Sequence, residues 1–206
     1  MKLFSSLRSR GISILATLIA IIAAGCVSPQ FDASYYLDPK PARTDYSDLV
    51  PPVSRQPVYL VFDMYSAEGS FPEATRKLGP KVARTISNSR MFSTVSKVGS
   101  ENMARISVSM RETGVHSGHG PKTLPAGLSS GLPGSRGVIT YGFTFQFQAP
   151  GKETVKKVYP HAVHLVDKDT TGFGDALPMT AGHAVDRMVE QAVLGFLLDL
   201  QKERKL

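Results

Sequence analysis

The sequence predicts an α+β fold, a two-layer sandwich in which a mainly antiparallel sheet of about five strands carries two helices on one face. Three observations predict it. Apolar and polar residues alternate over 58–66, two longer alternating segments flank a turn at 149–152, and an apolar stripe with helical spacing runs from 181 to about 202. The expected element order is β-α-β-β-β-β-α, which lets both helices bury their stripes against the same face.

The first predicted strand, 58–66, has the period of two that a half-buried strand requires. Its inward set is Val58, Leu60, Phe62 and Met64, and its outward set is Tyr59, Val61, Asp63 and Tyr65. A helix is expected from about Phe71 to Asn88, because apolar residues recur every four positions and Ser70 begins a capping-box pattern. The Gly79-Pro80 pair inside it predicts a kink or a second helix start.

Two further strands are expected at 92–98 and 104–113. The second alternates apolar residues with an outward polar set, Arg105, Ser107, Ser109 and Arg111. Residues 114–137 follow, and they are too rich in glycine and proline for a helix or a strand. Because a compact domain rarely carries so long an irregular segment without a purpose, we expect a functional insertion there.

The last two strands, 137–148 and 153–167, are expected to form a long hairpin around the turn at 149–152. One face of the first carries a row of apolar side chains, Ile139, Tyr141, Phe143, Phe145 and Phe147. Such a row needs a cover. The helix 181–202, capped by Thr180, supplies it because its apolar residues form a broad stripe.

The first 25 residues have the features of an export signal. Three basic residues precede an uncharged stretch from Gly11 to Gly25, which is shorter than the ~20 apolar residues that a membrane-spanning helix needs. Removing 1–25 removes three of the 24 basic residues and none of the 17 acidic ones, so the net charge falls from +7 to +4. With no basic run interleaved with aromatics, nucleic acid is not an expected partner. The densest basic cluster, Lys152, Lys156 and Lys157, is typical of a solvated strand face, and the alternative is a contact with an anionic headgroup or glycolipid.

Cys26, the only cysteine, excludes an intrachain disulfide and every multi-cysteine metal site. The run Ala23-Ala24-Gly25-Cys26 resembles the lipobox of bacterial lipoproteins. The resemblance implies that 1–25 is a cleaved lipoprotein signal peptide and that Cys26 carries acyl chains such as palmitate. It also implies an outer-membrane anchor with a periplasm-facing domain, because Val27 stands where an aspartate would favour the inner membrane. Residues 26–57 are proline-rich and are expected to form an extended tether to a domain at 58–206.

The predicted element order, the lipobox and an aliphatic first strand together resemble one group of proteins. These are small periplasmic lipoproteins of Gram-negative bacteria that share a fold with the curli secretion lipoprotein, the lipopolysaccharide-assembly lipoprotein and the amino-terminal domain of the Tol-system propeller protein. The resemblance covers Val58 to Leu200. It implies a non-catalytic, cofactor-free adaptor, assembly or transport-accessory lipoprotein that acts on envelope protein partners. The alternative is a homo-oligomeric subunit of an outer-membrane export channel or secretion ring.

The candidate chemistry is sparse, so we expect neither an enzyme nor a metal site. His161 and His164 lie three apart on a strand and point to opposite faces, whereas His116 and His119 lie in the insertion without an acid or cysteine nearby. The loop 118–123 lacks the contiguous Gly-Lys-Thr of a phosphate-binding loop, because Pro121 interrupts it. No serine has a nucleophile-elbow context. An enzyme would require His116, His119 or Asp63 to meet a second titratable group in a pocket.

The outward face of the first strand holds the candidate interface residues. Asp63, Tyr59 and Tyr65 share this face, which lies opposite Phe62. If this face is in contact with solvent, Asp63 is simply exposed. If another subunit covers the face, Asp63 is an interface residue.

Overall fold

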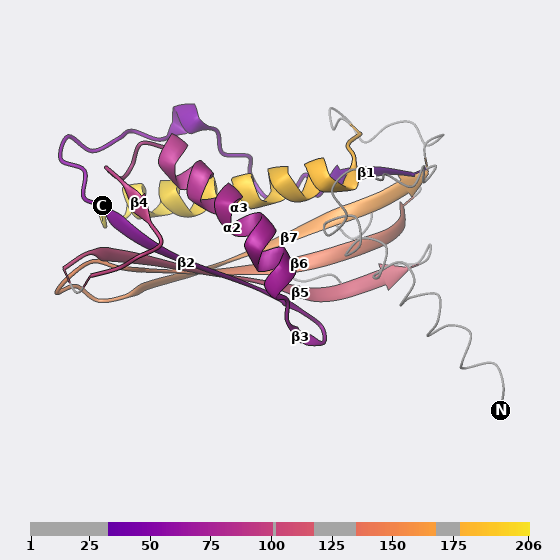
Figure 1. Cartoon of the computed structure of the whole chain (residues 1–206). Coiled ribbons are helices and arrows are strands. Elements are labelled where there is room, and N and C mark those ends of the chain that lie inside the picture. The colour runs from indigo at the N-terminus through magenta and orange to yellow at the C-terminus, as the bar shows by residue number, and fades with distance from the viewer. Residues whose placement is uncertain (1–32, 101, 118–134, 168–177) are drawn as a thin grey trace.

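The computed structural model describes residues 33–100, 102–117, 135–167 and 178–206 (Figure 1). In these residues, seven strands form one sheet with the order β1-β7-β6-β5-β2-β3, and β4 pairs with β2. The strands are β1 (Ala33–Leu37), β2 (Val58–Ser66), β3 (Gly69–Ser70), β4 (Val95–Ser96), β5 (Ala104–Ser117), β6 (Ser135–Gln148) and β7 (Val155–Asp167). The helices are α2 (Pro72–Asn88), α3 (Ala181–Lys202) and the short 3-10 helix η1 (Tyr46–Asp48). The α+β class is therefore confirmed, whereas the expected number of about five strands is wrong.

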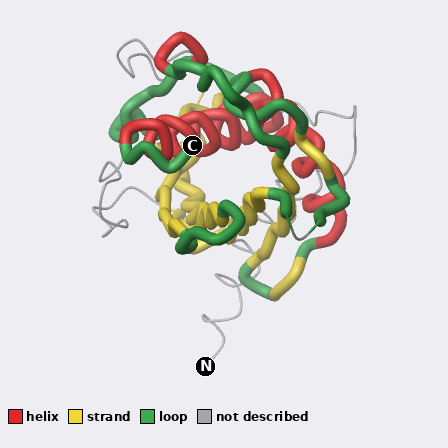
Figure 2. The backbone as a smooth tube through the Cα atoms, turned by 90° about the vertical axis from the view of Figure 1, so that its left-hand side faces the viewer, coloured by secondary structure: helices red, strands yellow, loops and turns green. Residues whose placement is uncertain are grey.

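Both long helices cover the same face of the sheet, as Figures 1 and 2 show. The apolar row of β6 is buried beneath them, and the Phe145 ring stacks on Phe196 of α3 at a centroid distance of 4.6 Å. Burial of each large apolar side chain contributes about 1.5–3 kcal/mol. Lys81 of α2 and Asp186 of α3 form an ion pair between the two helices. The packing of α3 on the hairpin is thus as expected from the sequence.

The two helices begin differently. α3 starts as predicted, because the Thr180 hydroxyl accepts a hydrogen bond from the backbone N–H of His183. At α2 the capping-box prediction is wrong, since Ser70 belongs to β3 and Phe71 precedes the helix without a side-chain cap. Pro72 starts α2 in the first turn, where its missing N–H has no intrahelical partner to lose. α2 then runs through Pro80 without a break, so the expected second start does not occur.

The sheet is mainly antiparallel, as predicted, with one long parallel pair. β5, β6, β7 and β1 pair antiparallel in that order. β2 and β5 run parallel because α2 carries the chain from one end of the sheet back to the other. The turn at 149–152 joins β6 to β7 as expected, with Gly151 at a positive φ of 72°.

The predicted tether is wrong for Ala33–Leu37, which forms the edge strand β1 on β7. The tyrosines of this strand are buried, and so is Leu49 further along. Between them the chain lies on α3. The Gln191 side chain accepts from Thr44 N at 2.9 Å and donates to Thr44 O at 3.1 Å. The folded domain therefore begins well before residue 58.

Two other boundaries differ from the prediction. Residues 92–98 form only the short strand β4, because Met91 and Phe92 enter the core from an irregular segment. The insertion expected at 114–137 is shorter, since β5 extends to Ser117 and β6 begins at Ser135. A register shift between Glu112 and Gly114 lets β5 continue through its glycine. Residues 118–134 lie outside the described part of the chain.

Candidate interaction site

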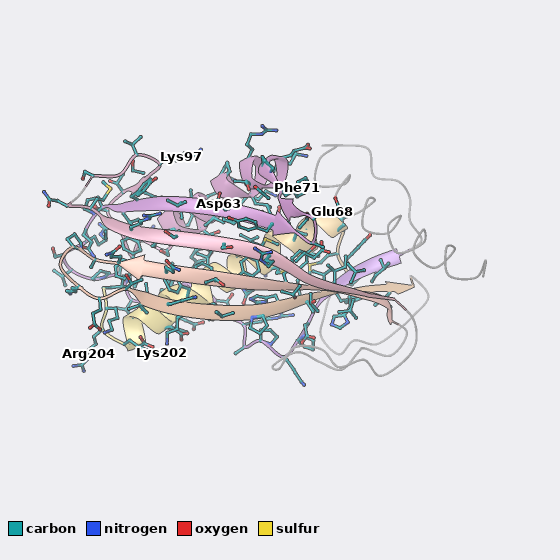
Figure 3. The ribbon with its side chains drawn as sticks, turned by 90° about the horizontal axis from the view of Figure 1, so that it is seen from below. Asp63, Glu68, Phe71, Lys97, Lys202 and Arg204 are labelled. Atoms are coloured by element: carbon teal, nitrogen blue, oxygen red, sulfur yellow. The ribbon has the colours of Figure 1, made fainter. Side chains whose placement is uncertain are left out.

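Along β2 and the neighbouring parts of β5, β6 and β7, the face of the sheet opposite the helices is not covered by any described element, and Figure 3 looks onto it. Every second side chain of four neighbouring strands points to this side. We call this surface the open face. Its rows across β2, β5, β6 and β7 are Tyr59, Arg105 and Gln148; Val61, Ser107, Gln146 and Lys156; Asp63, Ser109, Thr144 and Val158; and Tyr65, Arg111, Gly142 and Pro160.

Each tyrosine of the open face lies beside an arginine of β5. The guanidinium carbon of Arg111 is 4.8 Å from the centroid of the Tyr65 ring, and that of Arg105 is 5.9 Å from the Tyr59 ring. Direct pairing of β2 with β5 places both arginines, because the two tyrosines and the two arginines have the same spacing. At an exposed site each such cation–π contact contributes about 0.5–1 kcal/mol.

The structure brings the three predicted interface residues together on the open face. Asp63 is exposed between the two half-buried tyrosines, as its label in Figure 3 shows. The sequence pattern also places Arg105 and Arg111 outward, but it does not show that they lie beside Tyr59 and Tyr65. That requires the strand register, which the alternation alone does not determine.

A hollow of about 540 Å³ lies at one end of the open face, beside the β6–β7 turn. We call it the end pocket. Its floor is the row Tyr59, Arg105 and Gln148. Its walls are Gly99, Ser100 and Met103 on one side and Ala149, Pro150 and Gly151 on the other. The size falls in the range of small-molecule sites.

A buried polar cluster lies at the opposite end of the sheet, where β1 joins β7. His164 Nε2 is 3.1 Å from Asp38 Oδ2, and the two side chains are 0% and 1% exposed. The other ring nitrogen of His164 has no hydrogen-bond partner among the described residues. The pair fixes the chain just after β1 to the strand beside it.

His161 belongs to the helix-covered face, so the prediction that it and His164 point to opposite faces is confirmed. Its ring meets Phe143 edge-on at 5.6 Å. Burial lowers the pKa of His161 to about 4, although the charge of Asp38 acts in the other direction. Burial raises the pKa of Glu112 on the same face. Near neutral pH the His161 ring is therefore neutral, whereas burial makes the charged form of Glu112 less favourable than in water.

A second hollow, of about 350 Å³, lies between α3, β7 and the segment at 41–44. Tyr159 donates there to Asp199 Oδ2 at 2.6 Å, and burial together with this carboxylate raises the pKa of the tyrosine. Lys157 of the predicted solvated lysine cluster pairs instead with Glu203 after α3. These contacts fasten α3 to the sheet and leave Lys156 as the cluster's member on the open face.

Several predicted residues lie outside the described part of the chain, namely Cys26, His119 and the loop around Pro121. Within the described ranges, no cluster of three His, Cys, Asp or Glu side chains is arranged to hold a metal ion. Nor does any described helix have the length and hydropathy needed to cross a membrane. Among the described residues, Asp63 lines neither of the two hollows given above.

Comparison with known proteins gives structural similarity alone. No protein-family model matches the chain, and no curated protein matches its sequence. The rare lipoprotein B from Shewanella oneidensis superimposes with a TM-score of 0.37 at 10% identity, covering 73% of this chain and 94% of that one. The PelC L103M dodecamer from Paraburkholderia phytofirmans gives 0.32 at 11% identity, with 81% and 97% covered. An uncharacterized protein gives 0.28 at 8% identity, with 74% and 94% covered. All three scores are below 0.5, so these similarities carry no conclusion about function.

Proposed function

We propose that this chain is a lipid-anchored accessory protein of the bacterial outer membrane, without catalytic activity, that binds an envelope protein through the open face. The observation that carries the proposal is the exposure of a four-strand face bearing two tyrosine–arginine pairs. Tyrosine and arginine are enriched in protein interfaces and in their binding hot spots. A face with this composition, in a chain whose N-terminal run resembles a lipobox, suits an adaptor at a membrane surface.

The charge of the open face indicates the partner's chemistry. Arg105, Arg111 and Lys156 are opposed by a single acid, Asp63. None of the ion pairs among the described residues involves these four side chains. The complementary surface is therefore acidic, with a basic or donor group opposite Asp63.

The position of β1 limits how far the domain stands from the membrane. If Cys26 carries the lipid, only the short segment before Ala33 separates it from the sheet. At ~3.3–3.6 Å per residue, that segment spans at most about 25 Å. The end of the sheet that bears β1 then faces the bilayer. The end pocket lies beyond the full length of the 14-residue strand β6, about 45 Å further away.

The anchor is tested by Cys26→Ser. We expect the variant to leave the membrane fraction or to remain unprocessed, because each buried acyl methylene contributes about 0.8 kcal/mol to membrane binding. Membrane fractionation with an immunoblot for size distinguishes these results. Membrane-bound Cys26→Ser protein of mature size would show that the anchor is not at this residue.

Partner binding by the open face is tested by placing a photo-crosslinking residue at position 63 in intact cells. The matched control position is Arg84, on the exposed side of α2. We expect an adduct with another protein from position 63 and none from position 84. The double variant Arg105→Glu and Arg111→Glu should remove the adduct without unfolding the domain. Adducts that form equally at both positions, or that contain only this chain, would contradict the adaptor; the second result would support the ring or channel subunit instead.

A further inference from the structure

The end pocket contains one charged side chain among its described lining residues, Arg105. The ion pairs of the described residues do not include Arg105, whose guanidinium lies over the ring of Tyr59. Asp63, the acid of the same face, is four residues further along β2, about 13 Å from Tyr59. Among the described residues, therefore, no carboxylate forms an ion pair with the positive charge in this hollow.

The polar side chains that line the hollow with Arg105 are hydrogen-bond donors. Gln148 stands directly opposite Arg105 across the β5–β6 pair, and both residues line the hollow. Ser100 adds a hydroxyl from the facing wall. A guanidinium presents a planar fork of donors, an amide offers an NH₂ group and a hydroxyl turns to suit its partner. This set complements an oxygen-bearing anion.

Gly99 fixes the shape of the site. A Cβ atom at this position would lie 2.6 Å from the Tyr59 ring, which no real side chain tolerates. Glycine therefore lets the backbone at position 99 rest on one part of the ring, while the guanidinium carbon of Arg105 lies 5.9 Å from the ring centroid. The arginine is held against an aromatic surface before any ligand arrives, which reduces the ordering that binding requires.

We propose that the end pocket binds a monoanionic carboxylate, such as the C-terminal carboxylate of a peptide. Arg105 and Gln148 contact the carboxylate oxygens, and the adjoining apolar group packs on Met103, Pro150 and the edge of Tyr59. One guanidinium balances one negative charge and matches a planar carboxylate through two parallel hydrogen bonds. A phosphate dianion would need a second cation, which the described lining lacks. The site shares Arg105 with the open face, but carboxylate binding requires neither the anchor at Cys26 nor a bound partner.

The probe is N-acetyl-leucine, compared with its uncharged analogue N-acetyl-leucinamide and with phenyl phosphate. Each is titrated into the full-length protein in detergent, and binding is followed by NMR shifts of the backbone amides of Gly99, Ser100, Met103 and Arg105 and of Gln148, Ala149 and Gly151. We expect the acid to bind at least tenfold more tightly than the amide and the phosphate. Raising the salt concentration from 20 to 300 mM should weaken the binding of the acid, because salt screens the attraction between the guanidinium and the carboxylate.

The variants test the residues. Arg105→Gln should reduce the affinity for N-acetyl-leucine at least tenfold. Gly99→Ala should also reduce this affinity, because the added methyl group displaces the wall of the pocket from Tyr59. Arg111→Gln is the matched control, since Arg111 also lies over a tyrosine on the open face but outside the pocket; we expect less than a twofold change. Circular dichroism verifies that each variant is folded. Equal binding of acid and amide, tighter binding of phosphate, or equal losses from Arg105→Gln and Arg111→Gln would each overturn the proposal.

Discussion

Alternate residues of the same strands form the two faces of the sheet, yet the faces differ in polarity and in exposure to solvent. Along β6, Phe143, Phe145 and Phe147 are nearly inaccessible beneath the helices, whereas Thr144 and Gln146 between them lie on the open face. The covered face is apolar and packs against α2 and α3. The open face is polar and aromatic, and Val158 there is 61% exposed. The difference teaches that one face determines the fold and the other remains available for binding.

The largest expected effect comes from one residue of the covered face. Phe145→Ala removes a fully buried ring that stacks on Phe196, and it should lower the free energy of unfolding by about 3–5 kcal/mol through lost burial and an unfilled cavity. Thr144→Ala, one residue away on the open face, should change it by no more than about 0.5 kcal/mol. Urea unfolding followed by circular dichroism measures both. Similar values for the two variants would mean that the faces do not differ as described.

A pH-dependent effect of intermediate size comes from His161 on the covered face. Its pKa is about 4 when folded and near 6.5 when unfolded, so between these values the unfolded chain binds a proton that the folded chain does not. Stability contributed by the neutral imidazole is therefore fully present above pH 6.5 and is lost as the pH falls toward 4. At 1.36 kcal/mol per pKa unit, the loss is about 3 kcal/mol.

The measurement is the free energy of unfolding at several pH values between 4 and 7, for the unsubstituted protein and for His161→Leu. The difference between the two profiles isolates His161. Burial raises the pKa of Glu112, so its contribution to stability decreases as the pH rises above 4.5. This contribution is the same in both proteins and cancels in the difference. His183→Gln, at an exposed position of α3, is the matched control and should follow the unsubstituted protein. Parallel profiles for the protein and His161→Leu would contradict the assignment.

The covered face was largely predictable from the sequence, because periodicity reports which side chains share a face. The alternation at 58–66 and the stripe at 181–202 both correspond to observed elements. β1 was not predictable in the same way. Ala33–Leu37 is short and is followed by prolines, so only its pairing with the edge of β7 makes it a strand. Residues 92–98 show the opposite error, since Phe92 is buried in the core from a loop.

For the open face, the sequence predicts which residues of β2 lie on it but not which residues they contact. Asp63, Tyr59 and Tyr65 follow from the alternation of one strand, but the contacts of the tyrosines depend on a second strand 46 positions further along the chain, in parallel register. The end pocket depends on three strands and two loops together. Such sites need the tertiary arrangement, because no local pattern encodes which rows become neighbours.

The smallest expected effect concerns the tyrosine–arginine pairs. If the open face serves binding, these pairs contribute little to the stability of the fold. In a double-mutant cycle of Tyr65→Leu and Arg111→Gln, we expect a coupling energy of about 0.5–1 kcal/mol, because the guanidinium lies 4.8 Å from the ring centroid at an exposed site. The cycle of Tyr59→Leu and Arg105→Gln should give a smaller value, since the distance is 5.9 Å. Thermal or urea unfolding measures both cycles. A coupling well above 1 kcal/mol in either would show that the open face contributes to folding in the same way as the covered face, and the proposed division between a folding face and a binding face would then fail at these pairs.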